Sequence, residues 1–328
     1  MTETCKFGIL DIGIWNLFGV WCLGFGISKY IMFITKLGEF GLIEHFRKSI
    51  RTDVSVIQGS GDDCAVLSLD KFRYQLFTCD MMMEGVDFTL KDRPYLIGRK
   101  AMAIQISDIA ACAGIPRHCL VSLGLPPDTS LRFVDELLRG MRAMARQFKV
   151  NIVGGDLSRS SKLVIDVSML GVVRKKDLLL RSGARLHDII FVTGTLGGSI
   201  RGKHLTFTPR VKQALFLTKN FKLHAMIDIS DGLLQDLHHI LERSKVGAVV
   251  YEQLIPVAKH SHIKEALSMG EDFELLFTLP KQEAKKLMKR KIRMFRPIGE
   301  IVTKVEGLNL IGRDGKPKPF HIKGYRHF

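Results

Sequence analysis

The chain has 328 residues, of which 46% are hydrophobic, and a formal net charge of +16 at pH 7. This length and apolar content can fill one large core or, as we expect, two. The basic residues are spread along the chain, and the short clusters at 174–176 and 285–291 contain no interleaved aromatic side chains. Composition therefore argues against nucleic acid as a partner and favours a basic surface that steers anionic small molecules.

The first 35 residues differ from the rest. Residues 12–28, IGIWNLFGVWCLGFGIS, are uncharged and approach the lower length limit of a transmembrane helix. Four glycines weaken this stretch as a helix, and Asp11 precedes it where a signal peptide has basic residues. It is a marginal membrane anchor, an extra buried element, or a stretch outside the functional protein. We favour the last, without membrane attachment, because the segment from Met32 looks like a natural start.

Cysteine and histidine give no metal or disulfide framework. The six cysteines form no CxxC pair, which indicates free thiols in a reducing, cytoplasmic compartment. His238, His239, His260 and His262 lack a convincing zinc spacing, so we interpret them as surface residues.

From Lys36 onward, strands and helices follow one another regularly. Periodicity predicts helices over 39–50, 94–113 and 131–148, and strands over 65–69, 74–80, 118–125, 151–154 and 163–173. Beyond a charged turn it predicts strands over 188–193, 225–229, 248–251 and 273–279, and a helix over 209–217. The expected fold class is α+β, a two-domain mixed α/β architecture. Its parts are a hydrophobic extension (1–35), an N-terminal domain with a mostly antiparallel sheet (36–173), and a C-terminal α/β domain (174–328).

The stretch AMIDISDGLLQDL, residues 225–237, carries an unexplained carboxylate. Ser230 or Asp231 can cap the helix that follows, but Asp228 lies inside the apolar run. A buried carboxylate without a partner costs several kcal/mol or becomes protonated. Asp228 is therefore expected to face a cation.

The same arrangement recurs at Asp63, Asp80, Asp108 and Asp156. A single buried aspartate is more often a cap or an ion-pair partner, but five in one chain favour chemistry. Carboxylates beside glycine-rich turns suit Mg²⁺ ions shared with phosphates. No GxGxxG follows a strand and no GxxxxGK[ST] occurs, so the predicted nucleotide site is neither of the Rossmann nor of the Walker type.

Ten motifs stand in an order that resembles a known family. They are GEFGLI, GSGDDCAVL, TCDMMMEGVDF, ISDIAACAG, GGDLS, RSGA, VTGTLGGS, IDISDG, GEDFELLF and the closing KGYRHF. Together they resemble thiamine-monophosphate kinase, within the superfamily of aminoimidazole ribonucleotide synthetase, over residues 37–328. The resemblance implies an enzyme that phosphorylates thiamine phosphate to thiamine diphosphate with ATP and several Mg²⁺ ions. It also implies a homodimer in which the N-terminal sheets pack together.

The resemblance further implies the site residues. The implied metal ligands are Asp63, Thr78, Cys79, Asp80, Asp108, Asp156, Asp228 and Asp231. The implied ATP contacts are Gly155, Asp156, Arg181 and Ser230, and the implied substrate contact is Glu271. Three positions depart from the family, which usually has a hydroxyl residue at Cys79, a histidine at Asp87 and an aromatic residue at Ile322; the last two lie on the substrate side.

The charges of the reactants suggest a mechanism. Phosphate attacks phosphate, so metal ions must offset the repulsion and align the groups for in-line transfer. Because the nucleophile is already an anion, no protein general base is expected. Glycines 154, 155, 197 and 198 would let the backbone approach phosphate oxygens, although ordinary tight turns explain Gly197 and Gly198 equally well.

Two alternatives remain open. The first is another ATP-dependent enzyme of the superfamily, acting on a different phosphorylated or carboxylated small molecule. Selenophosphate synthetases and hydrogenase-maturation relatives would need a reactive N-terminal or a C-terminal cysteine, respectively, and neither setting is found here. The second is a non-catalytic nucleic-acid-binding module, which only the net charge of +16 supports.

Overall fold

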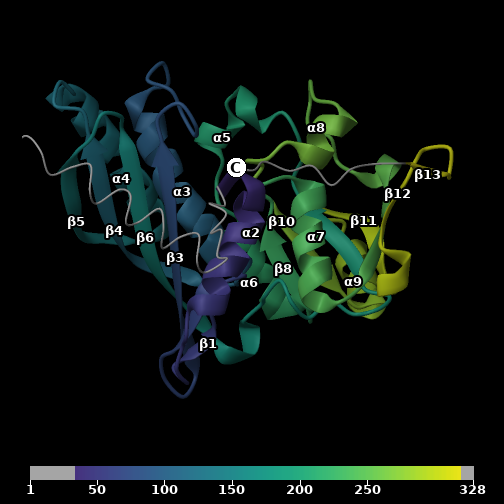
Figure 1. Cartoon of the computed structure of the whole chain (residues 1–328). Helices are drawn as coiled ribbons and strands as arrows, with labels where there is room; N and C mark the ends of the chain where they lie inside the picture. Colours follow the sequence, from purple (N-terminus) through teal and green to yellow (C-terminus); the bar gives the residue numbers. More distant parts are fainter. Residues whose placement is uncertain (1–33, 319–328) are drawn as a thin grey trace, which may run out of the picture. The chain divides into compact units, whose positions relative to one another are not determined.

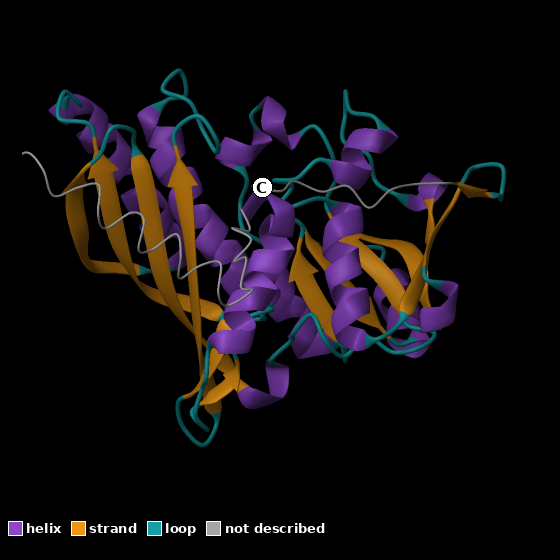
Figure 2. Ribbon diagram, viewed as in Figure 1, coloured by secondary structure: helices purple, strands orange, loops and turns teal. Residues whose placement is uncertain are grey.

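The computed structural model describes residues 34–318 (Figures 1 and 2). The described residues divide into two compact units, residues 34–50 and residues 51–318. In the first, helix α2 (Ile34–Ser49) is interrupted at Gly38, where φ is 65°. The helix predicted over 39–50 is thus confirmed, with an earlier start. The uncharged stretch at 12–28 lies outside the described residues, and no helix within 34–318 is long and apolar enough to cross a membrane.

The N-terminal sheet of the larger unit has the strand order β1-β2-β3-β6-β4-β5. Neighbouring strands are antiparallel except β4 and β5, which are parallel. This confirms the predicted mostly antiparallel sheet. The bounds in spatial order are β1 (Val56–Gln58), β2 (Ala65–Ser68), β3 (Arg73–Met83), β6 (Val164–Arg174), β4 (Ile115–Leu125) and β5 (Asn151–Arg159).

Two long helices, α3 (Pro94–Ala111) and α4 (Leu131–Phe148), pack against each other on one face of this sheet (Figure 1). Ser130 caps α4, because its Oγ accepts a hydrogen bond of 3.3 Å from the backbone N–H of Phe133. The left-handed Lys149 ends the same helix. These two signals give α4 the bounds that periodicity predicted.

The C-terminal sheet has the strand order β13-β12-β9-β11-β7-β10-β8, in which only β9 and β12 are parallel. Its strands are β7 (Ile189–Thr193), β8 (Ala225–Asp228), β9 (Gly247–Tyr251), β10 (Leu275–Leu279), β11 (Phe295–Val302), β12 (Leu308–Ile311) and β13 (Pro317–Lys318). The α-helices of this part are α5 (Lys203–Thr206), α6 (Val211–Asn220), α7 (Leu233–Ser244), α8 (Ile263–Ser268) and α9 (Lys281–Lys289). Single 3₁₀ turns are η1 (Lys175–Asp177), η2 (Ser199–Arg201), η3 (Glu252–Leu254) and η4 (Lys304–Glu306).

Helix α3 joins the two halves of the larger unit. It contacts β3, β4, β6 and α4 of the N-terminal half and α5, α6 and β8 of the C-terminal half. Most of its residues are buried, as its uniformly apolar sequence predicted. One continuous core therefore extends from Leu76 and Ile165 in the first sheet to Phe191 and Phe277 in the second.

The structure differs from the predicted elements at two informative places. Strand β10 begins at Leu275 rather than at 273, because Phe273 has a left-handed backbone with φ of 49°. Helix α7 begins at Leu233 with Gly232 as its N-cap residue, so neither Ser230 nor Asp231 is the cap. Instead Oδ2 of Asp236 accepts hydrogen bonds from the backbone N–H groups of Asp231 and Gly232 at 3.1 and 3.0 Å.

Two glycines allow α3 and α4 to touch through their backbones. A Cβ atom at Gly98 would lie 2.0 Å from the carbonyl oxygen of Leu137, and one at Gly140 would lie 1.9 Å from that of Tyr95. No side chain can relieve these contacts by rotating, because both neighbours are backbone. The close approach of the helices therefore depends on glycine at both positions.

We expect Gly140→Ala to destabilise the protein by about 1–3 kcal/mol or more, because the added methyl group forces α3 and α4 apart. The matched control is Gly41→Ala in α2, where the new Cβ would lie 3.4 Å from the Cβ of Leu37. Alanine is the better helix former, so the control should be neutral or stabilising by up to about 1 kcal/mol. Urea unfolding of both variants measures the difference. Equal effects of the two substitutions would contradict the close helix contact.

Candidate active site

Four aspartates from separate elements converge beside α3. They are Asp63 in the turn before β2, Asp80 on β3, Asp108 on α3 and Asp228 at the end of β8. Burial raises the pKa of Asp108 well above its ordinary value, and the charges of Asp80 and Asp228 raise it further. Burial and the charge of Asp63 raise the pKa of Asp228 to about 7. The group is thus a set of mutually repelling carboxylates that favours protons or a cation.

Neutral donors hold three of these carboxylates in place. The Thr78 hydroxyl donates to Oδ2 of Asp108 at 2.5 Å. The Ser107 hydroxyl donates to Oδ2 of Asp228, and Nε2 of Gln105 donates to Oδ2 of Asp80 at 3.1 Å. Hydroxyl and amide groups orient a carboxylate without cancelling its charge. The arrangement therefore fixes the oxygens and leaves their negative charge to a ligand.

Arg181 is the guanidinium at the edge of the cluster. Its Nη2 and Nε donate to Oδ1 of Asp63 at 2.6 and 3.0 Å, and its backbone N–H donates to the carboxylate of Asp62. Burial lowers the pKa of Arg181, but Asp63 outweighs that effect and the pKa is raised. Arg181 is therefore a permanent positive charge next to the aspartates.

The donor set fits a hard divalent cation. Oδ2 of Asp63 is buried and has no hydrogen-bond partner among the described residues, and such an orphaned oxygen is costly without a ligand. Carboxylate and hydroxyl oxygens are the donors that Mg²⁺ prefers. Ligand atoms of Asp62, Asp63 and Cys112 lie within 4.8 Å of one another, and of these the two carboxylates suit Mg²⁺ whereas the thiol does not. The residues present thus fit Mg²⁺ ions bound between the turn before β2, strand β3 and helix α3.

A second group of potential ligands lies at the start of α7. Ligand atoms of Asp231, Asp236 and His239 lie within 4.8 Å of one another. Burial, followed by the charge of Arg181, lowers the pKa of His239 to about 3, so its imidazole is neutral. His239 is half-buried, so our surface interpretation was wrong for this residue. Asp236 was missed, although a carboxylate within the apolar stripe of α7 was the available signal.

The structure does not bring Asp156 to the cluster. Across the sheet, Asp80 on β3 pairs with Val167 on β6, Val167 with Val121 on β4, and Val121 with Gly155 on β5. Three strand spacings place Gly155 about 14 Å from Asp80. Asp156, one residue further, points to the opposite face of the sheet. Its carboxylate accepts a hydrogen bond from Ser158 at 3.1 Å.

Packing within the sheet accounts for the glycine at position 155, because the Cβ atom of any other residue would lie 1.7 Å from the carbonyl oxygen of Val121. Cys79 also faces away from the cluster, as its position between Thr78 and Asp80 requires. Its exposed Sγ contacts Oδ2 of Asp166 at 3.2 Å. Of the oxygen and sulfur atoms of Cys79, its backbone carbonyl oxygen is therefore the candidate donor that remains beside Thr78 and Asp80.

Two of the three residues on the substrate side meet at one lysine. Nζ of Lys100 on α3 donates a hydrogen bond of 2.8 Å to the carbonyl oxygen of Asp87 and forms an ion pair with Oε1 of Glu271. The backbone N–H of Glu271 donates to the carbonyl oxygen of Ser230 at 2.6 Å. Ser230 and Glu271 thus lie side by side next to Asp231. Ile322 lies outside the described residues.

Sequence reasoning also missed a buried ionic network behind Glu271. Glu274 accepts hydrogen bonds from Arg210 and Thr193, and Lys203 donates to it at 3.1 Å. Asp272 accepts a hydrogen bond of 2.8 Å from the backbone N–H of Gly197. The loop around Gly197 and Gly198 is therefore fixed to the segment that carries Glu271. The acidic residues of GEDFELLF were the available signal.

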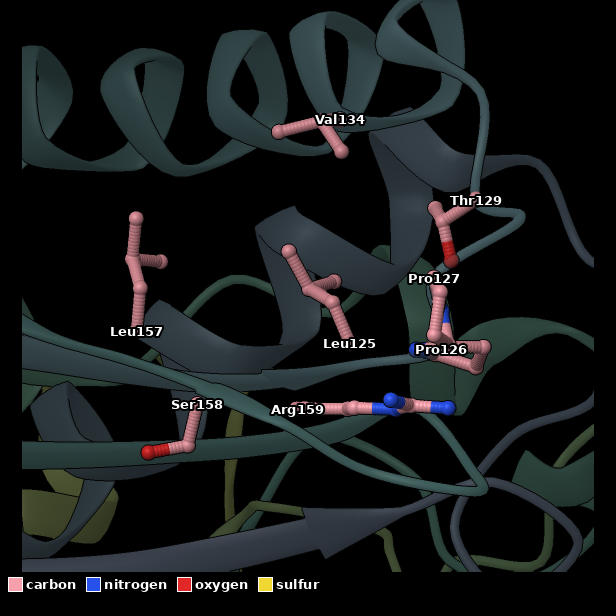
Figure 3. A pocket seen from close by; sticks show the side chains of 8 residues that line it. All are labelled: Leu125, Pro126, Pro127, Thr129, Val134, Leu157, Ser158 and Arg159. Atoms are coloured by element: carbon pink, nitrogen blue, oxygen red, sulfur yellow. The ribbon is translucent and has the colours of Figure 1, made fainter.

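An apolar pocket lies elsewhere, at the ends of β4 and β5 and the start of α4 (Figure 3). It has a volume of about 420 Å³ and is lined by Leu125, Pro126, Pro127, Thr129, Val134, Leu157, Ser158 and Arg159. Figure 3 shows Val134 pointing from α4 toward Leu125. None of the clustered aspartates lines this pocket, so it is separate from the acidic site.

We expect Asp228→Asn to stabilise the metal-free protein more strongly at pH 8 than at pH 5. The raised pKa of about 7 means that the folded state holds a proton that the unfolded state loses near pH 4. Wild-type stability therefore falls as pH rises from about 4 to 7, by at most about 1.4 kcal/mol per pH unit from this group. The variant has no carboxyl group at position 228, so its stability should not fall in this way. Thermal unfolding of both proteins in EDTA across this pH range measures the difference in stability.

The same variant should lose most of the thermal stabilisation that Mg²⁺ and ATP give together, because one oxygen ligand is gone. A variant destabilised equally at both pH values, with its ligand-induced shift intact, would show that Asp228 is a structural residue that pairs with buried donors.

Comparison with known proteins identifies the family of this chain. The family models of AIR synthase related protein match the chain with their N-terminal domain at residues 61–173 and their C-terminal domain at residues 183–308. Thiamine-monophosphate kinase of Buchnera aphidicola is 33% identical, over 89% of this chain and 99% of the relative. The corresponding protein of Aquifex aeolicus is 32% identical, over 90% of this chain and 100% of the relative.

The solved structure of AaThiL complexed with AMPPCP and TMP shares the fold with a TM-score of 0.80. It is 31% identical and covers 91% of this chain and all of that chain. Both the sequence relatives and this structure thus span nearly the whole protein. The chain therefore belongs to the thiamine-monophosphate kinase family.

Proposed function

We propose that this chain transfers the γ-phosphoryl group of ATP to thiamine phosphate, giving thiamine diphosphate. The observation that carries the proposal is the convergence of Asp63, Asp80, Asp108 and Asp228, beside Arg181, in a chain of this family. Clustered carboxylates suit bound cations and phosphates. The complex of AaThiL with AMPPCP and TMP supports the choice of the two substrates.

The four converging aspartates, with Asp231, would hold several Mg²⁺ ions. Bound Mg²⁺ would offset the negative charge of both phosphates. Arg181 then has a second role, because its guanidinium, now paired with Asp63, can also bind an oxygen of the triphosphate. Ser230 and the neighbouring Glu271 lie on the side where the acceptor would bind.

The transfer itself requires orientation rather than proton removal. A phosphate acceptor is already an anion at pH 7, so the protein need not supply a general base. Thr78, Gln105 and Ser107 keep the carboxylates in a fixed arrangement, which aligns the two phosphates for in-line attack. The same oriented charges stabilise the transition state without reorganisation.

We also propose that the protein is a homodimer closed through its N-terminal sheets. Strand β2 pairs with β3 only as far as Phe77, so residues Thr78 to Met83 are paired on one side only, to β6. Strand β5 pairs only with β4. Each sheet thus has two open edges within the described residues, and two copies can close them against each other.

The outer face of the sheet supports this arrangement, because Phe77, Met81 and Leu120 are 42%, 57% and 49% exposed. Exposed apolar side chains that share one face of a sheet favour an interface. Pairing β5 of one copy with the free half of β3 in the other would bring the partner's β5, with its Asp156, beside Asp80. The distance that separates Asp156 from the cluster within one copy would then be closed, and only the direction of its side chain would have to change in the dimer.

We further propose that the protein is located in the cytoplasm. The four cysteines of the described region, Cys64, Cys79, Cys112 and Cys119, are free thiols. Free thiols are usual where the compartment is reducing.

The direct test is a phosphotransfer assay of the purified chain with ATP and thiamine phosphate. We expect thiamine diphosphate with Mg²⁺ and none with EDTA. Asp108→Asn should lower turnover by about 100-fold or more, because it removes a fixed charge from the metal site. Asp135→Asn, an exposed residue of α4, should leave turnover unchanged. ATP consumption with another acceptor and none with thiamine phosphate would favour a different enzyme of the superfamily.

The shared site is tested by mixing inactive variants. Asp80→Asn and Asp156→Asn should each be inactive as homodimers. Unfolded together and refolded, they should regain about a quarter of wild-type activity, because half of the dimers are mixed and each mixed dimer has one intact site. The control mixture, Asp80→Asn with Asp108→Asn, should stay inactive, because each variant damages its own copy of the cluster. Absence of recovery in both mixtures would overturn the shared site.

A further inference from the structure

Lys100 is a buried cation that the phosphotransfer chemistry does not require. It lies in the middle of α3 and is 1% exposed. Its ammonium group contacts the carbonyl oxygen of Asp87 at 2.8 Å and pairs with Oε1 of Glu271. A buried ammonium group is stable only where such partners satisfy its charge. The position of Lys100 is therefore coupled to those of Asp87 and Glu271.

Glu271 is held in an unusual conformation. Its φ of 65° lies in the left-handed region, which residues other than glycine seldom adopt. Its backbone N–H donates to Ser230, and Asp272 next to it is anchored to the backbone of Gly197. Strain of this kind persists where surrounding contacts fix it, and it clusters at ligand sites. The Glu271 side chain is 25% exposed, and its ion pair with Lys100 restricts its rotation.

The other partner of Lys100 is a turn of the N-terminal half. The carboxylate of Asp87 accepts a hydrogen bond of 2.7 Å from the backbone N–H of Met83 and closes this turn. The carbonyl oxygen of Asp87 then points to Lys100. One ammonium group thus ties a turn of the first half of the protein to a loop of the second.

The location of this contact suits the far end of the acceptor. Lys100 and Asp108 lie eight residues apart on α3, a rise of about 12 Å. A small molecule whose phosphate lies at the acidic cluster would extend along α3 toward Glu271. Thiamine phosphate carries an amino-substituted ring at the end opposite its phosphate, and such an amine donates hydrogen bonds to a carboxylate.

We propose that Lys100 is a positioning residue that holds Glu271 for recognition of the aminopyrimidine end of thiamine phosphate. The inference rests on the proposed function. The ion pair uses Oε1 of Glu271, which leaves Oε2 to accept a hydrogen bond from the ring amine. Lys100 thereby sets the affinity for this substrate and takes no part in phosphoryl transfer.

The test compares Lys100→Met, Glu271→Gln and the double variant in steady-state kinetics. Lys100→Met should raise the KM for thiamine phosphate about tenfold or more, the change expected when an oriented charged hydrogen bond is lost. It should leave kcat and the KM for ATP within about threefold, the pattern of lost ground-state binding. Lys281→Met, which removes a surface ion pair with Glu300, is the matched control and should change neither.

The double variant decides between positioning and a structural role. If Lys100 acts through Glu271, adding Lys100→Met to Glu271→Gln should raise the KM no further. The double variant is also electrically neutral at the buried pair, so it remains testable if the single lysine variant fails to fold. Additive effects, or parallel changes in kcat and in the KM for ATP, would overturn the inference. A wild-type protein that fails to phosphorylate thiamine phosphate would instead refute the proposed function.

Discussion

The burial of helix α3 between the two halves of the larger unit is the constraint on which the site depends. A helix buried on most sides cannot turn its polar side chains to water, so each of them must find a partner in a neighbouring element. Two of these partners lie in the C-terminal half: Glu271 forms an ion pair with Lys100, and Asp228 accepts a hydrogen bond from Ser107. The third contact is in the N-terminal half, where Asp108 accepts a hydrogen bond from Thr78 on β3. These requirements fix the relative position of the elements that hold the candidate ligands.

The same burial makes the metal-free site unfavourable. Asp63, Asp108 and Asp228 lie in one region of low dielectric with neutral donors, and within residues 34–318 Arg181 is the cation that pairs with this group, through Asp63. Replacing any one carboxylate by an apolar group would relieve repulsion, so stability alone does not explain the cluster. A site that binds several cations and phosphates does explain it, because ligand binding then recovers the energy lost to repulsion.

The sequence predicted those parts of the site that have a local signal. Asp228 and Asp108 were found because an acidic residue inside an apolar run is conspicuous. Lys100 and Glu274 were missed, because their partners are distant in sequence. Lys100 and Glu271 are 171 residues apart, and Glu274 and Arg210 are 64 residues apart. Asp156 was grouped with the other aspartates, yet strand order and register place it on the far face of the sheet. Strand order depends on packing between distant elements, which no local pattern contains.

The departure at Asp87 leaves the contact between this turn and Lys100 intact. The resemblance places a histidine at this position, but the contact with Lys100 uses the backbone carbonyl oxygen of residue 87. That contact depends on the shape of the turn, which the carboxylate of Asp87 closes through the N–H of Met83. An aspartate therefore preserves the partner of the buried ammonium group while removing an aromatic ring from the surface of the turn. In the proposed acceptor site, recognition would then depend more heavily on Glu271, the carboxylate that pairs with Lys100.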